Sequence, residues 1–196
     1  MINFNRVLTM FFLCALPFGV CAAGLAPWQF GMTKEQVASF EQFGPYKSFQ
    51  NGDLETYNGE FDKQKRNVQF FFNVSGLNRI EINLYEERDR NQATAAFRGA
   101  CEYLRREYGE IEGHYFDLPP NCDCAKAAEA ATAQIVAGGK AQLVPVKQPD
   151  DLHLFSSYRS NNVMGFIFYS VVLYLDPPNR KDMPMVPPLL AKPAGH

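Results

Sequence analysis

The chain has 196 residues, 46% hydrophobic and 14% aromatic, with a formal net charge of −2 at pH 7. A slightly acidic chain without a clustered basic face lacks what nucleic-acid binding requires, which argues against that class of function. The length and the aromatic content predict one domain with a substantial core.

The first segment, residues 1–22, is predicted to be a cleavable secretory signal. Arg6 precedes an apolar run, Val7–Val20, that is shorter than the roughly 20 residues of a membrane-spanning helix. One alternative is a lipoprotein signal at Cys21, but the residues before this cysteine match such a signal poorly. The other is an uncleaved membrane anchor, but the residues after position 23 do not extend the apolar run. The expected location is therefore periplasmic or secreted, in a Gram-negative-type envelope.

The first predicted helix covers residues 34–43. Thr33 and Gln36 have the spacing of a capping box, and Gly44 with Pro45 stops the helix. Three strands joined by short turns are predicted to follow, at 54–61, 68–74 and 77–85. Strand 77–85 has the clearest two-residue alternation of apolar and polar residues.

The second half of the chain predicts two helices, at 91–108 and 124–136, separated by an irregular stretch at 110–121. Strands are then expected at 141–147, 152–159 and 163–175. The last two are joined by a tight turn at Asn161 and Asn162, because asparagine tolerates positive φ angles.

The predicted order is α-βββ-αα-βββ. Runs of strands alternating with helices predict an α+β fold, with an antiparallel sheet packed by two or three helices. The domain is expected to span residues 25–175. Residues 176–196 are rich in proline and are predicted to form a disordered tail.

Five cysteines occur in the chain, and Cys14 and Cys21 fall within the predicted signal. The other three are Cys101, Cys122 and Cys124. In an oxidising compartment three thiols predict one disulfide and one remaining cysteine. We expect Cys101 to bond either Cys122 or Cys124.

The stretch Trp28–Val37, with Gly31-Met32-Thr33 at its centre, and the following Phe43–Tyr46 resemble the opening of small exported bacterial domains. These are the β-lactamase-inhibitor-protein family and the outer-membrane assembly lipoproteins related to BamE. The resemblance implies a layered antiparallel sheet and a protein-binding function, as an inhibitor, immunity protein or assembly factor. The same motif also has a purely structural interpretation, in which Gly31 permits a tight entry and Thr33 caps the helix.

No stretch carries a catalytic signature, so no catalytic residue, metal site or cofactor is predicted. His114, His153 and His196 lack a neighbouring nucleophile motif such as Gly-x-Ser-x-Gly. The spacing of Cys122 and Cys124 is tighter than in structural zinc sites, which also favours a disulfide over a metal.

The function predicted from these features is a non-enzymatic periplasmic module that binds another protein, such as an inhibitor or immunity protein for an exported enzyme. An envelope assembly factor at the outer membrane is the alternative, and a small periplasmic hydrolase is a third hypothesis. Exposed tyrosines suit protein recognition. The predicted partner-binding residues are Tyr57, Phe71, Tyr85, Tyr103 and Tyr115.

Overall fold

The computed structural model describes residues 24–135 and 138–178. The predicted signal at 1–22 lies outside these residues, as does nearly all of the predicted tail. Along the described part of the chain, no helix has the length and the apolar character needed to cross a membrane.

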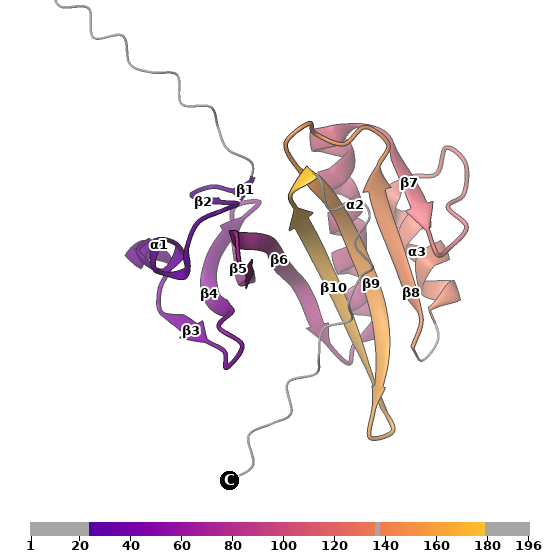
Figure 1. Cartoon of the computed structure of the whole chain (residues 1–196). Coiled ribbons are helices and arrows are strands. Elements are labelled where there is room, and N and C mark those ends of the chain that lie inside the picture. The colour runs from indigo at the N-terminus through magenta and orange to yellow at the C-terminus, as the bar shows by residue number, and fades with distance from the viewer. Residues whose placement is uncertain (1–23, 136–137, 179–196) are drawn as a thin grey trace, which may run out of the picture.

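The centre of the molecule is one antiparallel sheet of eight strands in the order β3-β4-β5-β6-β10-β9-β8-β7. Its strands are β3 (Tyr46–Ser48), β4 (Leu54–Phe61), β5 (Gln64–Asn73), β6 (Gly76–Glu87), β7 (Ile111–His114), β8 (Lys140–Pro145), β9 (His153–Val163) and β10 (Phe166–Asp176). Strands β6 and β10 pair in the middle, so they join the N-terminal and C-terminal halves of the chain. Figure 1 shows β6 bending as it crosses from one half to the other. Two short strands, β1 (Gly24–Leu25) and β2 (Trp28–Gln29), pair separately.

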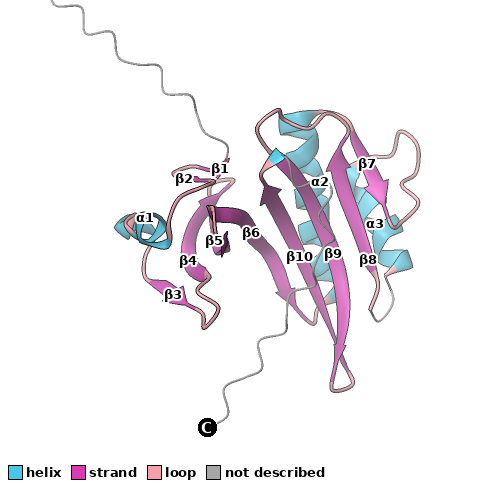
Figure 2. Ribbon diagram, in the orientation of Figure 1, coloured by secondary structure: helices cyan, strands magenta, loops and turns pink. Residues whose placement is uncertain are grey.

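The helices are α1 (Lys34–Ala38), the 3-10 helix η1 (Glu41–Phe43), α2 (Arg90–Tyr108) and α3 (Cys124–Gln134). Asp89 caps α2 by accepting hydrogen bonds from two backbone amides of its first turn, and Asp123 caps α3. Helices α2 and α3 pack together on one face of the sheet, behind β10, β9 and β8 in Figure 2.

The main core lies between these helices and the sheet. Phe97 of α2 is fully buried against Tyr158 of β9, with ring centroids 5.4 Å apart. In the N-terminal half, Trp28 is the buried aromatic residue of the core, and its ring centroid lies 4.8 Å from that of Phe70. Strand β6 contributes Ile80 to this core, which therefore runs continuously through both halves.

The predicted fold class, a helix-packed α+β domain in the order α-βββ-αα-βββ, is wrong. Strands make up 45% of the described residues and helical segments 26%, and one eight-stranded sheet dominates the fold. Strand β7 separates the two helices that were expected to be consecutive. Strands β1, β2, β3 and β7 have only two to four residues, which is too short for a recognisable alternation of apolar and polar side chains.

The turn between the last two strands also lies elsewhere than predicted. Asn161 and Asn162 continue β9, and the chain turns at Met164 and Gly165, which have φ angles of 52° and 85°. Asn162 supports that turn because its side-chain oxygen accepts a hydrogen bond from the Gly165 amide, at 2.9 Å. The asparagine therefore stabilises a neighbouring turn through its side chain instead of forming the turn itself.

A disulfide joins Cys101 of α2 to Cys124 at the start of α3, with the Cα atoms 5.6 Å apart. Cys122 is the free cysteine among the described residues, and it is buried. The prediction of one disulfide and one remaining thiol is thus confirmed, with Cys124 as the partner of Cys101. The bond fixes α3 to α2 and closes the loop that contains β7.

Candidate functional site

The sheet has a second face, on the side opposite to α2 and α3. We call it the open face, because the described helices all pack on the other side. Its central side chains are Glu55, Tyr57, Asn67, Gln69, Phe71, Arg79, Glu81, Asn83, Phe155, Ser157, Arg159, Val172, Tyr174 and Asp176. Cross-strand pairs such as Gln69 with Glu81, and Phe71 with Arg79, place these side chains together on one face.

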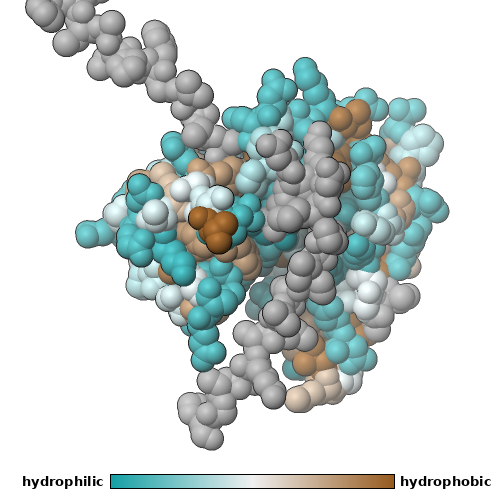
Figure 3. All heavy atoms as spheres, viewed as in Figure 1, coloured by the Kyte–Doolittle hydropathy of each residue, from teal (hydrophilic) through white to brown (hydrophobic). Residues whose placement is uncertain are grey.

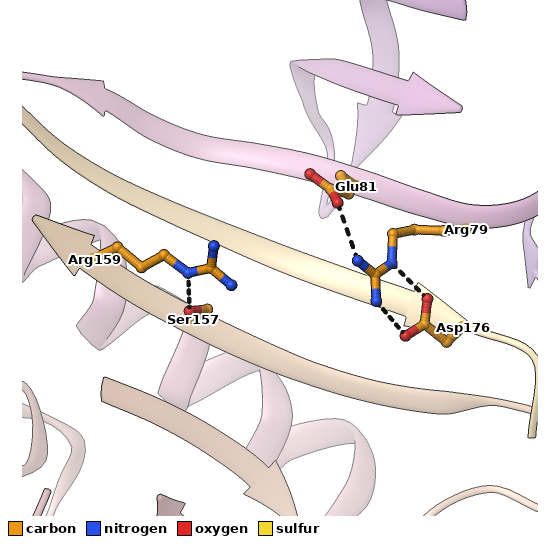
Figure 4. Close-up of polar contacts among 5 residues, drawn as sticks. All are labelled: Arg79, Glu81, Ser157, Arg159 and Asp176. Atoms are coloured by element: carbon orange, nitrogen blue, oxygen red, sulfur yellow. Dashed lines mark hydrogen bonds and ion pairs between the residues drawn. The ribbon is translucent and has the colours of Figure 1, made fainter. Parts of the chain in front are cut away.

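The centre of the open face is an ion cluster (Figure 4). The guanidinium of Arg79 donates two hydrogen bonds to the carboxylate of Asp176, at 2.7 and 2.8 Å. A second carboxylate, that of Glu81, lies 3.5 Å from Arg79. Burial of Arg79 opposes its charge, but these carboxylates outweigh that effect and raise its pKa above the ordinary value. Arg79 therefore stays charged at every physiological pH.

Aromatic rings surround this cluster. The Arg79 guanidinium lies 5.0 Å from the ring centroid of Tyr174, and the Arg159 guanidinium lies 5.7 Å from the same ring. Phe155 stacks on Tyr174 with centroids 4.8 Å apart. Burial, together with the negative charge of Glu81, raises the pKa of Tyr174 above its usual range. Arg159 also donates a hydrogen bond to the Ser157 hydroxyl, at 3.1 Å.

Towards β4 the open face becomes a ladder of amide side chains. The Asn67 amide donates to Glu55 at 2.7 Å, and Asn83 donates to Asn67 at 2.8 Å. The Gln69 amide donates to the same Glu55 carboxylate at 3.2 Å. Tyr57 stands beside this ladder and is 65% exposed, although it lies within β4. Its pKa is raised, first by desolvation and then by the charge of Glu55.

The five predicted partner-binding residues do not form one surface. Tyr57 and Phe71 lie on the open face, where Tyr57 is exposed and Phe71 is half-buried. Tyr85 and Tyr103 instead pack against the main core. Tyr115 follows β7 at the far edge of the sheet, where its ring lies 3.6 Å from the Lys140 ammonium.

The sequence of β6 indicated that one face of this strand is polar, since Arg79 and Glu81 alternate with Ile80 and Ile82. The partner of Arg79 was not predicted, because Asp176 is 97 positions away and was assigned to the tail. Asp176 is instead the last residue of β10, and it is buried.

The structure places the two described histidines on different strands, His114 on β7 and His153 on β9. His114 lies 2.9 Å from Glu112 on the edge strand β7, and both side chains are about half exposed. His153 stands opposite Asp176 in the pairing of β9 with β10, and the Asp176 carboxylate also binds Arg79. In the described ranges, 24–135 and 138–178, no group of three or more His, Cys, Asp or Glu residues is placed to hold a metal ion.

The β4–β6 part of the open face thus presents a partly exposed polar and aromatic surface whose amide side chains are held by hydrogen bonds. Comparisons with protein families, with characterised proteins and with solved structures give no significant match for this chain. The resemblance of the Gly-Met-Thr opening to exported inhibitors and assembly lipoproteins therefore stays a prediction. The structure does confirm that Thr33 and Gln36 form a capping box at the start of α1.

Proposed function

We propose that this protein is a non-enzymatic module that binds another protein through the β4–β6 part of its open face. The observation that carries the proposal is Tyr57, a large aromatic side chain that is 65% exposed in the interior of a strand. The amides of Asn67 and Asn83 lie on the same face, and each is partly exposed. Tyrosines next to adaptable hydrogen-bonding groups are typical of protein interfaces.

Rigidity of this surface supports the same proposal. The amide ladder is held by hydrogen bonds across β4, β5 and β6, and the Arg79 cluster extends the fixed arrangement into β10. A preorganised surface loses little side-chain freedom when it meets a partner, which favours tight binding.

An inhibitor or immunity protein for an exported enzyme is the finer form of the proposal, and the periplasm is the proposed location. The resemblance of residues 28–46 to exported inhibitors supports the first part. The disulfide between Cys101 and Cys124 supports the second, because such bonds persist in oxidising compartments.

The test is a pull-down from envelope extract with the domain that starts near residue 24, comparing the wild type with Tyr57→Asp. We expect one specific protein to be retained by the wild type and lost with Tyr57→Asp. Val74→Asp is the matched control, because Val74 is fully exposed in the turn after β5. Capture of no specific protein would overturn the proposal, and capture of an outer-membrane assembly component would favour the assembly-factor alternative.

A further inference from the structure

The hairpin formed by β9 and β10 extends beyond the rest of the sheet. The last residue of β9 that pairs with β8 is Arg159, and the first residue of β10 that pairs with β6 is Tyr169. Residues 161–168 therefore pair only across the hairpin. At roughly 3.4 Å per residue the tip projects on the order of 10 Å, as the lower end of the molecule in Figure 1 shows.

The tip of this hairpin is apolar and exposed. The exposed fractions are 95% for Met164, 54% for Phe166, and 38% each for Val163 and Ile167. Brown and tan atoms gather at the corresponding end of the molecule in Figure 3. None of residues 161–170 carries a charge. Apolar side chains gathered at a projecting point mark an interaction site, because their exposure to water is unfavourable.

Local contacts support the conformation of the tip. Met164 and Gly165 form the turn that Asn162 braces. At the base of the hairpin, the Arg88 guanidinium lies 4.3 Å from the ring centroid of Phe166 and 4.7 Å from that of Phe168. This stacking fixes the aromatic side of the hairpin before any partner arrives.

The base of the hairpin is acidic. Glu86, Glu87 and Asp89 surround Arg88, and together with Phe168 they line a shallow hollow beside the start of α2. All three acids are exposed, and Arg88, the cation that lines the hollow with them, stacks on the rings, whereas the guanidinium of the neighbouring Arg90 donates to the Thr132 carbonyl. This arrangement complements a basic surface. It does not suit a bilayer, where stable attachment of a short apolar anchor requires a second signal such as a basic patch.

We infer that the hairpin tip inserts into an apolar pocket on a partner protein whose rim carries lysine or arginine side chains. Phe166 and Phe168 continue the row of Tyr174 and Asp176 along β10, so the tip extends the open face itself. This inference rests on the proposed function, since it describes the same partner. It adds the chemistry that the partner must present.

The experiment places the photo-crosslinking residue benzoylphenylalanine at position 164 of the full chain, in cells that export it. The same residue at position 74 is the control. We expect one discrete protein adduct from position 164, and none from position 74. Adding Phe166→Asp to the chain should abolish that adduct. The protein in the adduct is then purified and its affinity for the variants is measured.

For that purified partner, Phe166→Asp should weaken binding by about ten-fold or more, as expected for a central anchor. The doubly reversed Glu86→Lys/Glu87→Lys should slow association by roughly three-fold and reduce its dependence on salt. Flotation with phosphatidylcholine and phosphatidylglycerol vesicles tests the membrane directly. Binding to vesicles that Met164→Asp removes would overturn the inference in favour of a lipid surface.

Two further outcomes separate this inference from the proposed function. A partner that depends on Tyr57 but binds Phe166→Asp with unchanged affinity leaves the proposed function intact and overturns the role of the tip. Absence of any adduct or pull-down partner overturns both. The thermal transition of each variant is measured as the folding control, and it should match that of the wild type because the tip packs on little besides Arg88.

Discussion

The two faces of the sheet are both largely buried, but different forces hold them. On β6, Ile80 and Ile82 are fully buried in the main core, and Arg79 and Glu81 are 9% and 8% exposed on the open face. The helix side is stabilised by removal of apolar area from water and by close packing. The open side depends on matched charges, whose burial is tolerable only while every member keeps its partners.

The two-residue alternation of β6 therefore serves two purposes, because it places apolar side chains in the main core and charged side chains in the ion cluster. A shift of one residue in the register of β6 would place Arg79 in the apolar core and Ile80 in the ion cluster. The two faces therefore fix the same register independently. Loss of one apolar residue should cost stability in proportion to the cavity it leaves, whereas loss of one charge should depend on whether its partner is also removed.

The largest expected effect is on the helix side. Phe97→Ala should lower the free energy of unfolding by about 4 kcal/mol, because it leaves a cavity beside Tyr158 and Phe116. Urea denaturation followed by circular dichroism measures this loss. Tyr57→Ala on the open face is the control and should cost less than about 1 kcal/mol, since Tyr57 is exposed. Equal losses in the free energy of unfolding for Phe97→Ala and Tyr57→Ala would show that burial does not determine the effect of substitution at these two positions.

The next effect tests the charges of the open face. Asp176→Leu should cost about 3 kcal/mol, because it removes the bidentate partner of the buried Arg79 and leaves it beside the Glu81 carboxylate at 3.5 Å. The double variant Arg79→Met/Asp176→Leu should recover most of that loss. Arg106→Met, which removes a half-exposed ion pair with Asp62, should cost less than about 1 kcal/mol. A double variant as unstable as Asp176→Leu would contradict our account of the cluster.

The disulfide, which lies on the helix side, should contribute a similar or slightly smaller amount to the free energy of unfolding. Cys101→Ala should lower stability by about 3 kcal/mol on chain-entropy reasoning, because the bond closes a loop with a sequence separation of 23. Cys122→Ala is the control and leaves the bond intact. Thiol titration of the denatured, unreduced protein without residues 1–22 should find one free cysteine, and a result of three would refute the pairing.

The smallest expected effect is a pH dependence that reports on the open face. Burial raises the pKa of Tyr174, so its contribution to stability is fully present below the unfolded pKa of about 10. Above that pH the unfolded state loses its proton first, and stability should fall by at most about 1.4 kcal/mol per pH unit for this group. Urea denaturation at pH 8 and at pH 11 measures the fall. The Tyr174→Phe variant should lose less stability between these two pH values. Part of the loss should remain in this variant, because the pKa of Tyr103 on the helix side is also raised.

The bounds of several elements were predicted well. Strand β4 begins and ends where expected, at 54 and 61. Helix α2 was expected at 91–108 and spans Arg90–Tyr108. The first helix was predicted too long, because α1 ends at Ala38 and its last predicted turn is the separate 3-10 helix η1.

The candidate site was predicted only in part, because its members come from distant parts of the chain. Tyr57 and Phe71 were identified from exposure and aromatic character. Tyr85 and Tyr103 were not distinguishable from them in the sequence, and they turn towards the core. The apolar tip at Met164 was missed because the turn was placed at Asn161 and Asn162, which hid the projection of the hairpin.

The sequence by itself determined the alternation of β6, the capping box of α1 and the presence of one disulfide among three cysteines. These properties depend on residues close together in the chain, or on simple counting. Only the tertiary structure decided that β6 pairs with β10, that Arg79 meets Asp176, and that Cys124 rather than Cys122 bonds Cys101. The first two depend on the distance in space between residues that are far apart in sequence. The third also depends on which of two nearby cysteines points towards Cys101. Local patterns carry neither kind of information.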